Sequence, residues 1–155
     1  MLKILIVEDT PERQEILKRL CKDHAWVLVQ TARRAISLLN AYGFDLIWLD
    51  YDLAGKEKGE AVAAVIRSGA NRRAKVVVHS MNSPGARRIL ELLPEADLIP
   101  LSKITRDNAT FKRTRGELAR GASLDWRLVF AEPGSGRRTV RPCNKPEEGP
   151  LHGRD

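Results

Sequence analysis

The sequence contains little cysteine, few aromatic residues and no long apolar run. Its 155 residues include two cysteines, Cys21 and Cys143, which lie far apart and lack the spacing of metal ligands. Neither a disulfide framework nor a cysteine metal site is therefore expected. No run approaches the roughly 18 consecutive apolar residues of a membrane span, and no secretory signal is visible at the start. These absences predict one cytoplasmic domain of ordinary size that makes no membrane contact.

The charge of the chain is basic and unevenly distributed. The net charge is +7 at pH 7, and the excess of basic side chains is denser after residue 103 than before it. Such a surplus can attract an acidic partner or nucleic acid. Aromatic residues do not alternate with the arginines there, so a platform for stacking single-stranded bases is not supported. A solvated basic tail is therefore favoured over one that binds nucleic acid.

Short apolar runs alternate with helical patterns through the first hundred residues. The pattern predicts strands at 2–7, 26–30, 44–49, 75–80 and 97–101, and helices that begin near Thr10, Thr31, Glu60 and Pro84, with a further helix within 105–120. Dense aliphatic runs indicate strands buried on both faces, and the alternation implies right-handed crossovers. We expect a doubly wound five-stranded parallel sheet with helices on both faces in residues 1–121. Residues 122–155 are expected to form a flexible basic extension rich in Pro and Gly.

Polar side chains follow the expected strands. In an open parallel sheet the site lies beyond the carboxyl ends of the strands. That edge would receive Glu8, Asp9, Asp50, Asp52, His79, Ser80 and Lys103. Converging carboxylates raise one another's pKa, and a hard cation such as Mg²⁺, which prefers oxygen ligands, removes that conflict.

Such a site suits phosphoryl chemistry. A carboxylate beside the metal can attack a phosphoryl donor, while Lys103 neutralises charge on the phosphoryl oxygens and Ser80 donates a hydrogen bond to them. A single acid after a strand is more often a loop residue or a helix cap, as Asp9 before Thr10 would be. Suitable groups at the ends of four different strands are much harder to assign to chance.

The segments KILIVEDT, DLIWLDYDL, VVVHS and LIPLSK resemble the receiver domains of response regulators, of the chemotaxis-regulator type, over about residues 2–120. The resemblance implies a flavodoxin-like fold with strand order 2-1-3-4-5. It also implies that Glu8 and Asp9 hold Mg²⁺ together with Asp50 and the backbone carbonyl of Asp52. Asp50 would then be the phosphoacceptor.

At other characteristic positions of the family, this sequence agrees at some and departs at others. The resemblance makes Ser80 the switch hydroxyl and Lys103 the partner of the phosphoryl group. Family members commonly carry an aromatic switch residue where Pro100 stands, and a proline where Ile104 stands. These departures concern how phosphorylation is transmitted to the surface and leave the phosphoryl chemistry itself unaffected.

The strand end LDYDL and the turn HSMN are similar to a receiver variant proposed to process cyclic phosphates. In that interpretation His79, Ser80 and Asn82 join the acidic residues and act on a phosphodiester, with the imidazole as general acid or base. Adjacent strand residues face opposite sides, so His79 and Ser80 need not both reach the phosphate.

Three hypotheses follow from the sequence. The first is a stand-alone receiver that accepts a phosphoryl group on Asp50 from a histidine kinase or phosphotransfer protein and then binds an unknown downstream protein. The second is a metal-dependent phosphoesterase that uses His79, Ser80 and Asn82. The third is a degenerate receiver that only mediates protein contacts.

Overall fold

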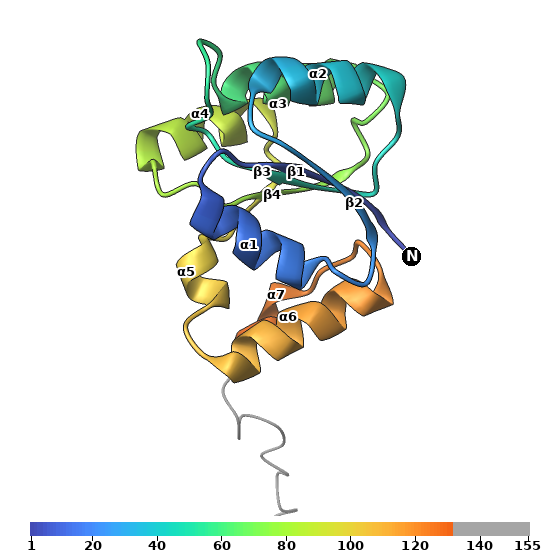
Figure 1. Ribbon diagram of the computed structural model, residues 1–155, viewed down its shortest axis with the longest axis vertical. Helices are drawn as coiled ribbons and strands as arrows, with labels where there is room; N and C mark the ends of the chain where they lie inside the picture. Colours follow the sequence, from blue (N-terminus) through green and yellow to red (C-terminus); the bar gives the residue numbers. More distant parts are fainter. Residues whose placement is uncertain (132–155) are drawn as a thin grey trace, which may run out of the picture.

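The structure is a computed structural model that describes residues 1–131 (Figure 1). In chain order its elements are β1 (Lys3–Val7), α1 (Pro11–Leu20), β2 (Ala25–Val29), α2 (Ala32–Ala41), β3 (Leu46–Leu49), α3 (Gly59–Ser68), β4 (Lys75–Val78), α4 (Ser83–Leu92), β5 (Asp97–Leu98), α5 (Leu101–Ile104), α6 (Asn108–Arg120) and α7 (Trp126–Val129). The helices of this part of the chain are too short or too polar to span a bilayer.

The five strands form one parallel sheet in the order β2-β1-β3-β4-β5. The α/β fold class, the strand order and the parallel pairing predicted from the sequence are therefore confirmed. β2 lies on one side of β1, whereas β3, β4 and β5 follow on the other, so the chain reverses its winding direction between β1 and β3. A switch of this kind opens a crevice beyond the carboxyl ends of the strands.

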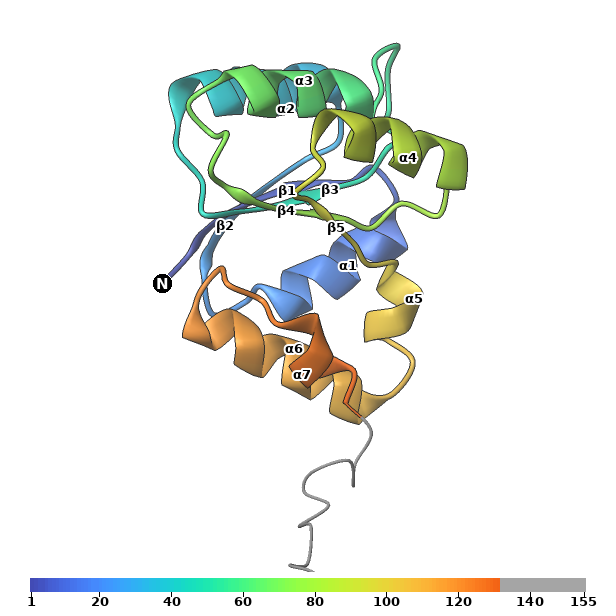
Figure 2. The same ribbon diagram turned by 180° about the vertical axis from the view of Figure 1, so that it is seen from behind.

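Helices cover both faces of the sheet (Figures 1 and 2). On one face lie α2, α3 and α4, and on the other lie α1, α6 and the short helices α5 and α7. Strand side chains alternate between these two layers: Leu5 and Val7 pack under α2 and α3, whereas Ile4 and Ile6 pack toward α1 and α6. Each face thus has its own apolar cluster, and both clusters are closed to water.

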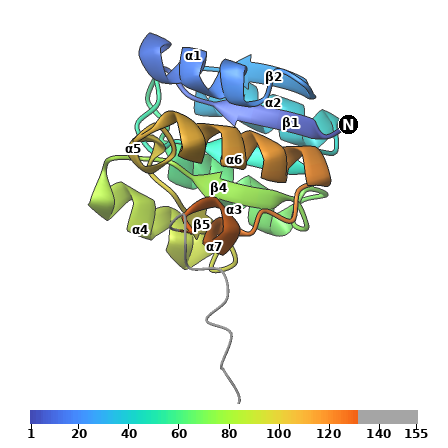
Figure 3. The same ribbon diagram turned by 90° about the horizontal axis from the view of Figure 1, so that it is seen from below.

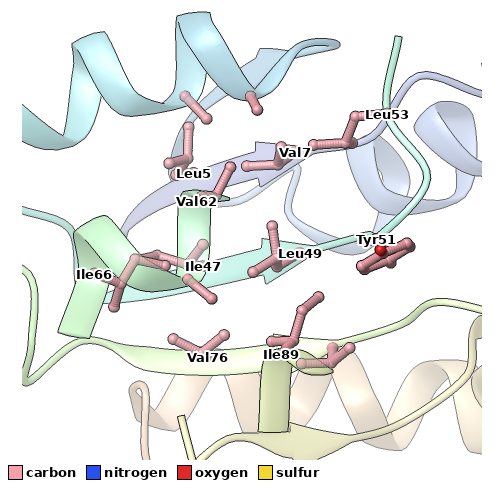
Figure 4. Packing of buried hydrophobic residues seen from close by; sticks show 14 of the residues in the cluster. Leu5, Val7, Ile47, Leu49, Tyr51, Leu53, Val62, Ile66, Val76 and Ile89 are labelled. Carbon is pink, nitrogen blue, oxygen red and sulfur yellow. The ribbon is translucent and has the colours of Figure 1, made fainter. Parts of the chain in front are cut away.

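The cluster beneath α2, α3 and α4 is shown in Figure 4. Val62 and Ile66 of α3 and Ile89 of α4 pack with strand residues such as Ile47 in this cluster. All four side chains are at most 1% exposed. Burying an aliphatic side chain of this size contributes roughly 1.5–3 kcal/mol, so this layer fixes the sheet that carries the site.

The chain after β4 differs in detail from the prediction. A strand was expected at 97–101, but β5 contains only Asp97 and Leu98, and Leu101–Ile104 forms the short helix α5. Pro100 explains the difference, because proline has no amide to continue a ladder. Its carbonyl instead accepts the amide of Lys103 at 3.0 Å, which starts the helical turn.

The packed structure continues beyond residue 121, into the segment assigned to the extension. Leu124 and Val129 are buried, and the indole of Trp126 donates from Nε1 to Oδ2 of Asp97 at 2.8 Å. Trp126 also lies edge-on to Trp48 and stacks on Phe130. In Figure 3, α7 lies beside α6 below β5. Residues 122–131 are thus packed on the sheet, and the rest of the expected extension, 132–155, lies outside the described residues.

Candidate metal and phosphate site

Glu8, Asp50 and His79 lie side by side just beyond the ends of β1, β3 and β4. The amide of Asp50 donates to the carbonyl of Val7 at 3.1 Å, and the amide of His79 donates to the carbonyl of Leu49 at 3.2 Å, so the parallel ladder continues through this level. Because side chains alternate along each strand, all three point to the face covered by α1. The sheet itself therefore places two carboxylates and an imidazole in one row.

His79 and Glu8 contact each other within this row. Nε2 of His79 lies 2.9 Å from Oε2 of Glu8, and both side chains are fully buried. A carboxylate only accepts hydrogen bonds when ionised, so the contact assigns the proton to Nε2 of the imidazole. Nδ1 of His79 is buried and has no hydrogen-bond partner within residues 1–131. Glu8 thus fixes the orientation of the ring and requires a proton on Nε2.

Glu8 accepts hydrogen bonds at both carboxylate oxygens. The amide of Thr10 donates to Oε1 at 2.8 Å, and Nε of Arg13 lies 3.1 Å from Oε2. Burial on its own raises the pKa of Glu8, but the hydrogen bonds from His79 and Thr10 and the charges of His79 and Arg13 outweigh it. The pKa of Glu8 is therefore lowered, and the group is ionised at neutral pH.

Asp50 is buried as deeply as Glu8, but its pKa is shifted in the opposite direction. Its Oδ1 accepts the amide of Tyr51 at 2.8 Å, and its Oδ2 accepts from a terminal nitrogen of Arg13 at 2.9 Å. Burial raises the pKa of Asp50. The charges of His79 and Arg13 and a hydrogen bond with Ser80 oppose this effect without cancelling it. Ionised Asp50 is thus an incompletely compensated buried charge, and a further cation would stabilise it.

The carboxylates of Glu8, Asp9 and Asp50 form a cluster that fits a divalent cation. Each offers one oxygen, and these three atoms lie within 4.8 Å of one another. Asp9 is half-buried, and within the described residues its carboxylate accepts only a long contact from the hydroxyl of Thr10 at 3.4 Å. A set of oxygen donors suits Mg²⁺ or Mn²⁺. Participation of the backbone carbonyl of Asp52 stays a prediction.

Ser80 and Asn82 lie on the β4 side of this cluster. The buried hydroxyl of Ser80 accepts the amide of Asn82 at 3.2 Å, and its interaction with Asp50 acts to lower the pKa of that carboxyl. Asn82 caps α4 through the amide of Gly85 at 2.9 Å, and its Nδ2 donates to Oδ2 of Asp52 at 3.0 Å. His79 and Ser80 therefore both lie near Asp50, whereas the side-chain amide of Asn82 is hydrogen-bonded to Asp52.

Lys103 forms no ion pair with the acidic cluster within the described residues. It lies on α5 with an exposed side chain. Among the residues that the structure describes, no carboxylate lies within 4 Å of its ammonium group. The sequence analysis placed Lys103 just after a fifth strand at 97–101, whereas the structure places it inside the short helix α5.

Arg13 is a charged residue of this site that the sequence analysis missed. It lies in the first turn of α1, and its guanidinium contacts Glu8 and Asp50 together. A cation is disfavoured in the first turn of a helix, because the helix dipole places positive charge there. An arginine at this position, four residues after an acidic pair, is the signal that would have identified it.

Two glycines permit the close approach of backbone around Asp50. A Cβ atom at Gly59 would lie 2.3 Å from the carbonyl oxygen of Asp50, and one at Gly85 would lie 2.3 Å from the ring of Tyr51. The amide of Gly59 donates to the carbonyl of Tyr51 at 2.8 Å. The loop after β3 therefore folds back on α3 and holds Asp50 in place.

Comparison with known proteins gives one family match. The model of the family described as "Cyclic-phosphate processing Receiver domain" matches residues 3–95, which is more than half of the chain. A search of curated protein sequences finds no match.

Solved structures of response regulators share this fold. The phosphorylated cyanobacterial phytochrome response regulator RcpA is 26% identical with a TM-score of 0.61, and the match covers 74% of this chain and 89% of RcpA. The Mn²⁺-bound response regulator Rcp1 is 24% identical with a TM-score of 0.60, covering 81% of this chain and 98% of Rcp1. The regulator TrrA from Thermotoga maritima, in complex with Mg²⁺ and BeF, is 21% identical with a TM-score of 0.58, covering 74% and 99%.

Proposed function

The chain belongs to the family of cyclic-phosphate processing receiver domains, and from this premise we propose that it is a metal-dependent hydrolase of cyclic phosphates on nucleotides or RNA ends. The observation that carries the proposal is the buried contact between His79 and Glu8, in the same row as Asp50. A covalent phosphoacceptor site has no evident need of this imidazole, whereas hydrolysis of a phosphodiester uses groups that hold and orient protons.

The residues divide into those that would hold a cation and those that would contact the substrate. Glu8, Asp9 and Asp50 would hold Mg²⁺ or Mn²⁺. When bound, the cation would neutralise charge on the phosphoryl oxygens and lower the pKa of a bound water. Ser80, whose hydroxyl interacts with Asp50, would turn its single proton to a phosphoryl oxygen of the bound substrate. His79 is a positioning residue, because it acts through Glu8.

The reaction is a hydrolysis with a simple balance. The oxygen of water bonds to phosphorus, and the bond from phosphorus to one ribose oxygen breaks. The site takes one proton from the attacking water and returns one proton to the departing ribose oxygen, so the product is a ribose monophosphate with one free hydroxyl. No redox partner or second substrate is needed.

The position of Lys103 supports hydrolysis over phosphoryl acceptance. A phosphorylated aspartate needs a cation against its phosphoryl oxygens, and the lysine expected to supply it lies exposed on α5. Asp50 is fully buried and already accepts hydrogen bonds at both oxygens. Both observations fit a carboxylate that holds metal for a phosphate bound next to it.

A second candidate function is phosphoryl acceptance on Asp50. Its place at the end of β3, beside two further carboxylates, favours this alternative. The solved structure of RcpA, 26% identical, is that of a phosphorylated response regulator. In this alternative a histidine kinase or phosphotransfer protein donates the phosphoryl group, and the modified protein binds a downstream partner.

Parallel assays of one preparation distinguish the two functions. The full chain is incubated with Mg²⁺ and 2′,3′-cyclic AMP, and separately with acetyl phosphate. The proposal expects adenosine monophosphate in the first assay and unmodified protein by mass spectrometry in the second. Phosphorylated protein that disappears in Asp50→Asn, without turnover of the cyclic phosphate, supports the second candidate instead.

A further inference from the structure

We propose that Arg13 is the phosphate-binding residue of this site, and that it leaves the two carboxylates for the phosphoryl group when a divalent cation binds. This inference rests on the proposed function for the identity of the substrate. Arg13 lies in the first turn of α1 and points at the row of acidic side chains. It would take a role that Lys103, exposed on α5, does not take.

The guanidinium occupies the place of a cation. One terminal nitrogen of Arg13 lies 2.9 Å from Oδ2 of Asp50, and Nε lies 3.1 Å from Oε2 of Glu8. These two carboxylates are members of the cluster that fits a metal. Mg²⁺ binds carboxylate oxygens at about 2.0–2.1 Å, so it would place a double positive charge close to the guanidinium. Arg13 and the cation therefore compete for the same pair of carboxylates.

The side chain of Arg13 is more accessible to solvent than the two carboxylates that it contacts. Its side chain is 21% exposed, whereas those of Glu8 and Asp50 are at most 1% exposed. Nε of Arg13 makes no well-aligned hydrogen bond within the described residues. The other anchor is a hydrogen bond from a terminal nitrogen to the hydroxyl of Thr10 at 2.8 Å. A rotation of this side chain toward solvent costs few contacts.

A guanidinium is well suited to binding a phosphoryl group. Its planar N–H groups pair with two oxygens of a phosphate, which a lysine ammonium cannot do in the same way. Lys58, in the loop after β3, is engaged elsewhere, because its ammonium donates to the carbonyl of Leu53 at 3.2 Å. Arg13 thus has both the chemistry and the position to bind the phosphoryl group of a substrate.

Calorimetric titration of the full chain tests the exchange without an activity assay. Mg²⁺ is titrated first, and inorganic phosphate is then titrated at saturating Mg²⁺. Arg13→Ala is expected to bind Mg²⁺ about tenfold more tightly, because its competitor is gone, and phosphate about tenfold more weakly. Arg13→Lys should lie between the two. Lys18→Ala, which removes the same charge from the exposed face of α1, should match the wild type.

Opposite changes in the two affinities are the signature of the exchange. Weaker Mg²⁺ binding by Arg13→Ala, or phosphate binding unchanged by that substitution, would overturn the inference. So would Lys103→Ala weakening phosphate binding when Arg13→Ala does not. If Arg13→Ala fails to fold, Arg13→Lys and Arg13→Gln provide the same comparison. If Arg13→Ala changes the two affinities in opposite directions but the wild type does not hydrolyse cyclic phosphates, the proposed function is refuted and the exchange still stands.

Discussion

Nε2 of His79 lies 2.9 Å from Oε2 of Glu8, and the two residues follow β4 and β1, which are separated in the sheet by β3. The contact therefore passes over Asp50, which follows β3 in the same row. His79 would therefore position Glu8, one of the carboxylates that we propose to hold the cation. Such partners fix ligand orientation, and their loss commonly reduces metal affinity.

Removal of the imidazole should weaken metal binding. His79→Ala is expected to reduce the affinity for Mn²⁺ by about tenfold, measured by electron paramagnetic resonance of free Mn²⁺. His79→Gln places an N–H donor near the position of Nε2 and should recover most of the affinity, whereas His79→Asn should recover less. Equal affinity in His79→Ala and the wild type would show that Glu8 does not depend on this contact.

The metal-free protein should gain stability from Asp50→Asn. Burial raises the pKa of Asp50, so its ionised form destabilises the fold at neutral pH, and this penalty disappears as the pH falls through the raised pKa. With a chelator present, thermal unfolding of Asp50→Asn is expected at a higher temperature than that of the wild type at pH 7. The difference should shrink toward acid pH, and a lower midpoint at pH 7 would contradict it.

Glu8→Gln should have the opposite effect under the same conditions. The pKa of Glu8 is lowered from 4.5, so its ionised form stabilises the fold above that pH, and the contribution is lost as the pH falls through the lowered pKa. Glu8→Gln is therefore expected to unfold at a lower temperature than the wild type from pH 7 down to about pH 4.5. A deficit that is already absent at pH 5 would show that the pKa of Glu8 is not lowered.

The loop that holds Asp50 should not tolerate a side chain at Gly59. Gly59→Ala places a methyl group against the carbonyl of Asp50, and we expect a loss of about 1–3 kcal/mol in the free energy of unfolding together with weaker Mg²⁺ binding. Gly116→Ala in α6 is the matched control, because no neighbouring group lies within 4 Å of the position that its methyl group would take. It should stabilise by up to about 1 kcal/mol. Equal urea midpoints for the two variants would contradict this account.

Residues 122–131 are expected to stabilise the domain without affecting its chemistry. Trp126→Ala removes the contacts with Trp48 and Phe130 and the hydrogen bond to Asp97. It should cost about 2–3 kcal/mol and leave Mg²⁺ affinity unchanged. Leu128→Ala, at a side chain that is 53% exposed, should change stability by less than about 0.5 kcal/mol. A negligible effect of Trp126→Ala would place the end of the folded domain near residue 121.

Much of the fold follows from local patterns in the sequence. Aliphatic runs such as Leu2–Val7 favour strands buried on both faces, as in a parallel sheet covered by helices, and strand order follows from the family resemblance. The end of β5 was predicted too late because Ile99 and Leu101 are both apolar and buried. That pattern fits a strand as well as an extended turn followed by a helix, and Pro100 decides between them through its missing amide.

The site was predicted in part for a similar reason. Residues that end a strand, such as Glu8 and Asp50, are placed by the sheet, so their meeting could be expected from the topology. The contact between Glu8 and His79 depends on which face each strand end presents, and that follows only from the observed register. Arg13 reaches the site from a helix, and its orientation depends on how α1 packs. Neither feature can be deduced from strand ends alone.

The most direct test of the proposed hydrolysis is the fate of 2′,3′-cyclic AMP with Mg²⁺ and the full chain. The wild type is expected to open the ring to a monophosphate, with no phosphoryl group on the protein. Activity should fall at least tenfold in His79→Ala and recover in part in His79→Gln. Turnover that is the same in His79→Ala, or a chain that hydrolyses no cyclic phosphate and instead carries a phosphoryl group on Asp50 after exposure to acetyl phosphate, would contradict it.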